Sequence, residues 1–269
     1  MQRQNGQSRR RWRIVPRREP IAHPSLWLML IEFTLVLFVT LAYFLTRGLV
    51  RGRESDAVEH ANKILRIESA LHLDPEQPIQ HFTLHHEWLL QFANNFYLYA
   101  HLPALIAVTV WLYWWRPWAY PWFRNAFLIS ALLGLSIYVL LPVAPPRFMP
   151  GFVDTMALYG FNVDGSAAGP LYNPYAAMPS LHVGWSLLTG IAMIAAAQSW
   201  WLKAAGIALP ILMTFAVIMT GNHYLLDVVT GAAVILVSLT LSTLWTSWHT
   251  ARVRTSRVPA WILPTLWRR

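Results

Sequence analysis

Two histidines and one aspartate have the residue types and the spacing that could do chemistry in this chain. His223 and Asp227 stand four residues apart in the segment 221–227. On a helix, residues at this spacing share a face and can touch. A carboxylate that contacts an imidazole N–H fixes the tautomer, and the other ring nitrogen can then act as a nucleophile or base. A histidine–carboxylate pair is also a common structural device, so this spacing alone leaves both interpretations open.

Two further segments carry groups that suit an anionic substrate. Arg147 follows two prolines that stiffen the backbone, and its guanidinium fork matches the oxygens of a phosphate. Pro179 and Ser180 predict a helix start, where free N–H groups form an anion site with His182 in the first turn. Taken singly, contact with lipid headgroups would explain the arginine, and ordinary capping would explain the helix start.

Together these groups predict phosphoryl transfer without a metal ion or other cofactor. His223 attacks phosphorus in line, while Arg147 and the amides at Ser180 hold the equatorial oxygens. His182 protonates the leaving oxygen and then activates the incoming water or alcohol. Asp227 stabilises the charge on His223. The chain has no cysteine, which excludes a thiolate nucleophile and a thiolate metal site.

The order of these segments resembles the type 2 phosphatidic acid phosphatase superfamily. The resemblance rests on Arg147, the run Pro179-Ser180-Leu181-His182 and the run His223-Tyr224-Leu225-Leu226-Asp227, and it spans most of residues 95–235. It implies six transmembrane helices, a phosphohistidine intermediate and no metal. It also assigns the nucleophile to His223, its partner to Asp227, the acid/base role to His182, and phosphate binding to Ser180 and Arg147.

Departures from the phosphatase pattern point to one branch of that superfamily. Leu181 stands where the phosphatases have glycine, no lysine precedes Arg147 at the usual place, and Ala216-Val217 replaces a Ser-Arg pair. These features resemble the branch that contains inositol phosphorylceramide synthase, which implies transfer of a phosphorylated headgroup between lipids. The alternative is a polyprenyl or lipid phosphate phosphatase that uses water. Fewer fixed cations suit a phosphodiester better than a doubly charged monoester.

Composition places these motifs in a membrane. Of the 269 residues, 56% are hydrophobic and 12% are charged, and the charged share is about half that of a typical soluble domain. The 15 tryptophans suit anchoring at bilayer interfaces. The sequence therefore predicts an all-α membrane protein built as a six-transmembrane-helix bundle. The expected spans are 26–45, 89–115, 123–141, 180–197, 204–220 and 223–245.

The polar segments define the expected domain organisation. Residues 51–91 have the pattern of an extracytoplasmic amphipathic region lying on the bilayer, and residues 142–179, rich in Pro, Gly and aromatics, form the expected active-site loop. Both belong to a transmembrane catalytic domain over 25–248, flanked by basic cytoplasmic tails at 1–24 and 249–269.

Basic residues predict the orientation in the membrane. With six spans, both tails and the two loops that hold Arg116, Arg124 and Lys203 share one side, which carries 15 of the 21 lysines and arginines. The positive-inside rule places that side in the cytoplasm, so the site faces the extracytoplasmic side, and we expect a plasma-membrane protein. The net charge of +9 lies mostly in the tails and suits anionic lipids rather than nucleic acid.

Other polar residues near the motifs are candidates for contact with a lipid headgroup, although packing or interface anchoring would also explain each one. They are Asn94, Tyr97, His101, Asn173, Tyr175, Asn222 and Tyr224. His81 and His85 could share a zinc ion, but no second ligand pair accompanies them, so no metal site is expected. Glu32, inside the first span, is expected to pair with another helix.

Two function classes other than an enzyme stay open at this stage. A haem-binding electron carrier could use His101, His182 or His223 as axial ligands, but the last two lie at helix starts rather than at mid-membrane depth. A transporter would use Glu32 and the polar second span. Membrane lipids are the expected substrates and acceptors, and the sequence does not determine the oligomeric state.

Overall fold

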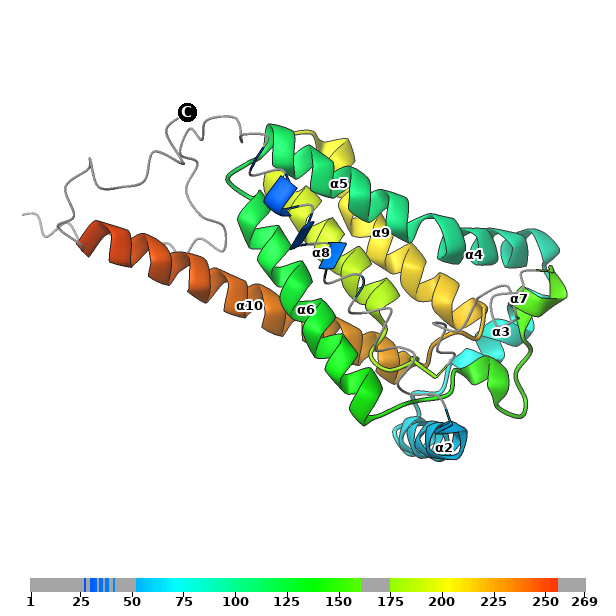
Figure 1. The fold of residues 1–269 in the computed structure, drawn as a ribbon. Helices are drawn as coiled ribbons and strands as arrows, with labels where there is room; N and C mark the ends of the chain where they lie inside the picture. Colours follow the sequence, from blue (N-terminus) through cyan, green and yellow to red (C-terminus); the bar gives the residue numbers. More distant parts are fainter. Residues whose placement is uncertain are drawn as a thin grey trace, which may run out of the picture.

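The computed structural model describes residues 52–160 and 175–255 and scattered residues between 27 and 41, and every regular element in these ranges is a helix. The predicted all-helical fold is therefore confirmed for this part of the chain. The elements are α2 (Glu54–Ala70), α3 (Glu76–Leu84), α4 (Glu87–Tyr99), α5 (His101–Trp115), α6 (Tyr120–Leu140), the 3-10 turn η2 (Pro146–Phe148), α7 (Thr155–Leu158), α8 (Leu181–Ala196), α9 (Trp200–Met219) and α10 (Leu225–Thr255). Figure 1 shows α5, α6, α8, α9 and α10 side by side as a bundle, with α2 at one end.

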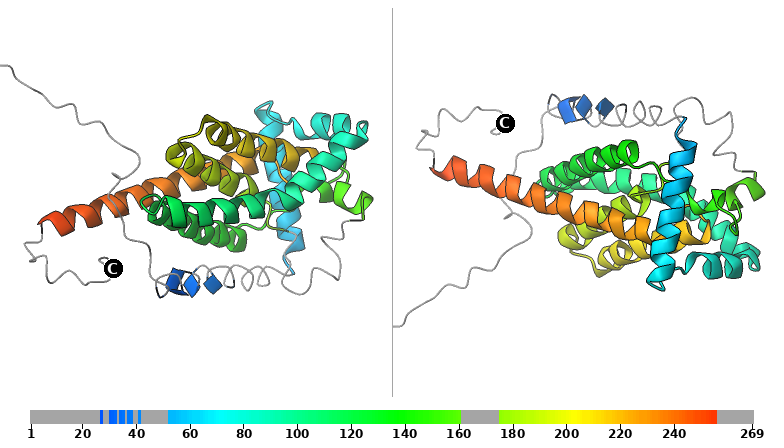
Figure 2. Two further views of the ribbon diagram at one scale, coloured as in Figure 1. Left: turned by 90° about the horizontal axis from the view of Figure 1, so that it is seen from above. Right: turned by 90° about the horizontal axis from the view of Figure 1, so that it is seen from below.

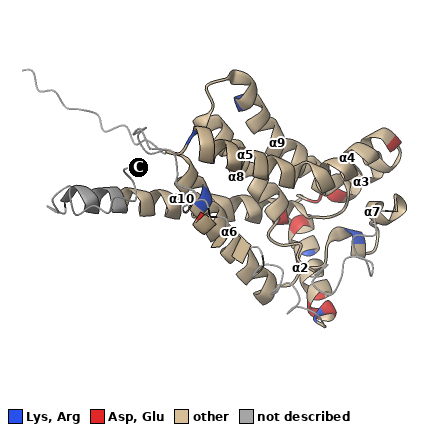
Figure 3. Ribbon diagram, turned by 45° about the horizontal axis from the view of Figure 1, so that its top comes forward, with Lys and Arg blue, Asp and Glu red and all other residues tan. Residues whose placement is uncertain are grey.

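Several helices have the length and apolar composition of membrane spans. α6, α9 and α10 each qualify, and α4 and α5 qualify together as one bent span. α8 is equally apolar but has only 16 residues. The structure describes only scattered residues of the predicted first span, between 27 and 41, so the number of six spans stays a prediction. Figure 3 shows few charged residues along the bundle helices α5, α6, α8 and α9, and many of those in the described chain lie around α2 and α3.

The second predicted span, over 89–115, is not one continuous helix. α4 and α5 meet at Ala100 and are bent by 44° relative to each other. Pro103 explains the break, because it has no N–H to donate to the carbonyl of Tyr99 and its ring crowds that carbonyl. The proline is well tolerated in the first turn of α5, where that N–H would have no partner within the helix. As a result, His101 lies at the start of a helix.

The predicted amphipathic region forms α2 and α3, which Pro75 separates as the N-cap of α3. One stripe of α2, made of Ala57, Ala61 and Ile64, is buried in an apolar cluster with residues of the loops that surround the start of α10. Figure 2 shows α2 running across the ends of the bundle helices. This is the arrangement expected of a helix that lies along a membrane surface.

α8 sits inside the bundle and is held by close contacts at glycines. A Cβ on Gly190 of α8 would lie 2.1 Å from the carbonyl oxygen of Gly206 of α9, so the two backbones touch at this crossing. At its other end, Leu181 fills the space that Gly134 of α6 leaves open, since a Cβ on Gly134 would lie 2.8 Å from the Leu181 side chain. These contacts fix the depth and rotation of α8.

Glu32 pairs with Arg124 of α6, as its place inside an apolar run predicted. The carboxylate also accepts a hydrogen bond from the Tyr120 hydroxyl at 3.4 Å. The pair joins the first apolar run to α6 far from the start of α10.

Gly190→Ala should destabilise the protein by about 1–3 kcal/mol, because the new methyl group overpacks the α8–α9 crossing. The midpoint of thermal unfolding in detergent should fall by several degrees. Leu132→Ala, at an exposed position of α6, is the control and should change the midpoint little. An unchanged midpoint for Gly190→Ala would contradict the close crossing.

Candidate active site

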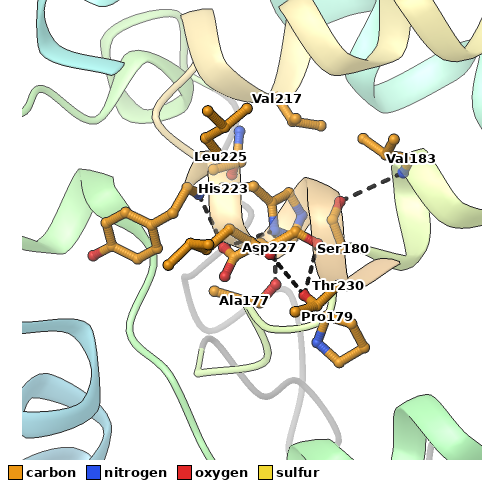
Figure 4. A network of polar contacts seen from close by, with 12 residues as sticks. Ala177, Pro179, Ser180, Val183, Val217, His223, Leu225, Asp227 and Thr230 are labelled. Atoms are coloured by element: carbon orange, nitrogen blue, oxygen red, sulfur yellow. Dashed lines mark hydrogen bonds and ion pairs between the residues drawn. The ribbon is translucent and has the colours of Figure 1, made fainter. Parts of the chain in front are cut away.

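Three segments that are distant in sequence meet where α8 and α10 begin. The N–H of Ser180 donates to the carbonyl of Asp227 at 2.9 Å (Figure 4). The N–H of Arg147 donates to the carbonyl of Gly221 at 2.8 Å. A Cβ on Gly231 of α10 would lie 2.3 Å from the carbonyl oxygen of Ser180, so glycine is required for this approach. Backbone contacts therefore join the three segments whose motifs the sequence singled out.

The turn before α10 fixes the direction in which the backbone enters the site. α9 ends in a Schellman motif, in which the N–H of Gly221 donates to the carbonyl of Ile218 at 3.0 Å and that of Asn222 donates to Val217 at 2.9 Å. Gly221 has a φ of 68°, which a residue with a side chain rarely adopts. The Gly-Asn pair ahead of His223 thus ends one helix and turns the chain toward the next.

His223 is buried, and its environment selects one tautomer. Its Nδ1 lies 2.8 Å from the carbonyl oxygen of Ala177 and 3.4 Å from Oδ2 of Asp227. Because a carbonyl oxygen only accepts, Nδ1 carries the proton. Nε2 therefore keeps its lone pair, as a nucleophile requires. Sequence reasoning gave the orienting role to Asp227 alone and missed the backbone carbonyl.

Asp227 reaches His223, but not across one face of a helix as the four-residue spacing implied. α10 begins at Leu225, so His223 precedes the helix and Asp227 lies in its first turn. Oδ2 of Asp227 also accepts the N–H of Tyr224 at 2.9 Å. This is the half of a capping box in which the third helical residue reaches back to the N-cap. Asp227 is fully buried.

His182 stands in the first turn of α8, facing His223. The two ring centroids are 5.7 Å apart, a separation that lets both imidazoles contact one phosphoryl group. The ring of Tyr97 lies 4.5 Å from His182, and that of His101 lies 5.1 Å away. His101 in turn stacks on Trp185 at 5.8 Å. The break between α4 and α5 thus brings two of the candidate headgroup residues beside the second histidine.

Arg147 is buried, and its guanidinium is held by neighbouring side chains. Nη1 donates to Oδ1 of Asn222, and Nε lies 3.6 Å from Oδ2 of Asp154. Asn222 is itself anchored by donating to the hydroxyl of Thr220 at 2.7 Å. These contacts give Asn222 a role in orienting Arg147. Asp154, which also caps α7, was not singled out from the sequence.

Ser180 is the N-cap of α8, as Pro179-Ser180 predicted. Its Oγ accepts the N–H of Val183 at 3.4 Å. The first-turn amides of α8 lie at the positive end of the helix dipole, on the end where His182 stands. A helix N-terminus of this kind attracts anions.

The remaining candidates have different surroundings. Asn94 is buried and exchanges two hydrogen bonds with Thr155, at 2.9 and 3.3 Å, and the buried Tyr224 donates its hydroxyl to Ala144 at 3.1 Å. Both have the partners of structural residues. Tyr175 packs its ring 6.2 Å from that of Phe148, and Asn173 lies outside the described residues.

Among the described residues, no third ligand joins His81 and His85 in a metal-binding group. Their ring centroids are 4.6 Å apart at the C-terminal end of α3, and the described ranges contain no group of three or more His, Cys, Asp or Glu arranged to hold a metal ion. No described residue therefore completes a metal site with His81 and His85.

Two buried glutamates at the site were missed by sequence reasoning. The N–H of Leu225 donates to Oε1 of Glu76 at 2.6 Å, and the N–H of Leu226 donates to Oε1 of Glu68 at 2.7 Å. With the bond from Tyr224 to Asp227, three consecutive N–H groups at the start of α10 donate to three different carboxyl groups. A signal for Glu68 was present, because it continues the buried 57, 61, 64 stripe of α2. Glu76 gave none.

Burial raises the pKa of Glu68 from its usual 4.5 to about 8, and the negative charges of Glu76, Asp227 and Asp74 act in the same direction. The hydrogen bond from Leu226 opposes this rise. Burial likewise raises the pKa of Glu76. Glu68 therefore holds its proton at neutral pH, which reduces the repulsion among the carboxylates around the start of α10.

Comparison with known proteins settles the family. A family model for the PAP2 superfamily matches residues 62–241, which include every motif and both glutamates described above. The chain belongs to the PAP2 superfamily. The resemblance inferred from the motifs is thereby confirmed.

One curated relative of this PAP2 protein is phosphoinositol dihydroceramide synthase of Bacteroides thetaiotaomicron. The two are 28% identical over 181 residues, which make up 57% of this chain and 56% of the relative. The chain therefore spans about half the length of that relative. No solved structure matches the PAP2 chain significantly.

The pKa of Glu68 predicts how the stability of the PAP2 protein depends on pH. A carboxyl that holds its proton more tightly when folded stabilises the native state at low pH, and this contribution is lost between the unfolded pKa of 4.5 and the folded pKa of about 8. Unfolding midpoints in detergent should show this decline in the wild-type protein and a smaller decline in Glu68→Gln. Equal pH slopes for the two proteins would contradict the buried, protonated glutamate.

Proposed function

We propose that this PAP2 superfamily protein is an integral-membrane enzyme that transfers a phosphorylated headgroup from a phospholipid to the hydroxyl of another lipid. The reaction passes through a phosphohistidine on His223. The observation that carries the proposal is the arrangement of the two imidazoles: the Nδ1 proton of His223 points to Ala177, and the ring of His182 stands 5.7 Å away.

The first half-reaction forms the covalent intermediate. Nε2 of His223 attacks phosphorus, and the bond from phosphorus to the oxygen of the leaving lipid alcohol breaks. His182 begins as an imidazolium and gives its proton to that oxygen. The His223 ring becomes cationic, and Asp227, 3.4 Å from its Nδ1, stabilises the charge.

The second half-reaction restores the enzyme. Neutral His182 takes the proton of the acceptor hydroxyl, whose oxygen attacks phosphorus, and the phosphorus–nitrogen bond breaks with its electron pair returning to Nε2 of His223. His182 ends protonated, ready for another cycle. With a lipid phosphate monoester as substrate and water as the acceptor, the same residues would make a lipid phosphatase.

The charge around the phosphate supports a phosphodiester substrate. Arg147 and the first-turn amides at Ser180 hold the equatorial oxygens in this mechanism. Asp154, 3.6 Å from Nε of Arg147, offsets part of the positive charge. A singly charged phosphodiester needs less compensation than a doubly charged monoester. The printed name of the Bacteroides relative, a phosphoinositol dihydroceramide synthase, also favours transfer over hydrolysis.

Family membership favours an enzyme over the haem carrier and the transporter. We place the reaction on the extracytoplasmic face, with both termini in the cytoplasm and the plasma membrane as the location, because of the distribution of basic residues. Membrane lipids serve as the substrate and the acceptor.

Replacement of the histidines should separate their roles. His223→Ala should abolish turnover of a labelled phospholipid and leave no covalent adduct in intact-protein mass spectra after an alkaline quench. His182→Ala should lower the rate by about 10²- to 10⁴-fold, because it removes general acid–base catalysis. His85→Ala, an exposed histidine outside the site, is the control and should keep the wild-type rate. Full activity in His223→Ala would disprove the proposed nucleophile.

Chelators should leave the reaction intact, since the proposed chemistry uses only protein side chains and amides. The test is the rate of product formation from a labelled phospholipid, with and without EDTA and with a ceramide-type acceptor, followed by mass spectrometry of the lipids. Loss of activity in EDTA that added metal restores would refute the metal-free mechanism. If mass spectrometry finds the phosphate released to water and none of it attached to the acceptor lipid, the result would favour the phosphatase.

A further inference from the structure

We propose that Glu68 and Glu76 are positioning residues for the nucleophile: from α2 and α3 they hold the N-terminal turn of α10 and thereby place His223 at the phosphorus atom. The proposal rests on the function proposed for His223. It assigns a role in the reaction to two helices that lie outside the candidate spans.

The start of α10 cannot be capped by its own residues alone. The N-cap position holds Tyr224, whose hydroxyl is directed away to the carbonyl of Ala144. Side chains that normally cap a helix are short and polar, and none occupies this position. The first N–H groups of a helix have no intrahelical acceptors, so Leu225 and Leu226 require acceptors from elsewhere. Glu76 and Glu68 supply them from 149 and 158 residues away in the sequence.

The location of these two bonds couples them to the nucleophile. His223 is two residues from Leu225 and three from Leu226, and only Tyr224 separates it from the helix. Its ring must satisfy two contacts at once, with Ala177 and with Asp227. A shift of the first turn of α10 would therefore change the direction in which Nε2 points. Small displacements of a reacting group are costly for the rate, because attack requires near-ideal alignment.

The glutamates are also unlike ordinary structural caps. Both side chains are almost completely buried, at 0% and 1% exposure, and Oε2 of Glu68 has no hydrogen-bond partner among the described residues. Glu76, Asp227 and Asp74 are the charged groups that act on Glu68 from the neighbouring segments. Burying carboxyl groups together is unfavourable, and polar groups left unpaired in a fold often belong to functional sites.

The experiment compares three substitutions at each glutamate. Glu68→Gln and Glu76→Gln keep an acceptor oxygen at the same reach, Glu68→Asp and Glu76→Asp shorten the side chain by one methylene, and Glu68→Ala and Glu76→Ala remove the acceptor. Glu59→Ala on the exposed side of α2, where Glu59 pairs with Lys63 at 2.7 Å, is the matched control. The assays are the rate of covalent adduct formation at saturating phospholipid, the KM for that lipid, and the thermal unfolding midpoint.

The Ala and Asp variants should form the adduct about 10- to 100-fold more slowly, with a KM within about twofold of the wild-type value, at temperatures well below their unfolding midpoints. The Gln variants should recover most of the rate, and Glu59→Ala should match the wild type. Wild-type adduct rates in the Asp variants, or losses that only follow the folded fraction, would overturn the positioning role. If an Ala variant does not fold, the adduct rate of the Asp variant at the same position tests the positioning role.

The two proposals can fail separately. Full activity in His223→Ala would remove the proposed function whatever the glutamate variants do. An inactive His223→Ala together with wild-type adduct rates in all the glutamate variants would leave the proposed function standing and refute the positioning role alone.

Discussion

The N-terminal turn of α10 is held by carboxyl groups, and the geometry of the site depends on that interaction. Tyr224, Leu225 and Leu226 each donate a backbone N–H to a different acid, and only one of these acids belongs to the helix itself. The carbonyl of Asp227 then receives the N–H of Ser180, so α8 is attached to the same turn. Both histidines are therefore placed relative to one small piece of backbone.

Much of this arrangement was visible in the sequence because it depends on local rules. Ser180 caps α8 since a short hydroxyl after proline is a typical helix start, and the break at Pro75 follows from the geometry of proline. The apolar runs predicted the helices that could cross a membrane. Four-residue spacing predicted the contact of His223 with Asp227, although the contact forms at a helix end and not along a helical face.

The features that the sequence did not reveal depend on backbone atoms or on long-range contacts. The carbonyl of Ala177 orients His223, and a carbonyl has no signature in the residue type. Glu76 meets its partner 149 residues away. Glu68 lies on the buried stripe of α2, but a glutamate among other charged residues is normally interpreted as exposed. The break at Ala100 had a signal in Pro103, and the surrounding apolar run obscured it.

The length of α8 has a consequence for how a lipid reaches the site. Sixteen residues rise about 24 Å along a helix axis, whereas the hydrocarbon core of a bilayer is about 30 Å thick. With its Ala196 end at one interface, the Ser180 end stops short of the opposite headgroup plane. In the proposed reaction, the phosphate of the lipid would therefore have to sink slightly below the headgroup plane to reach His182.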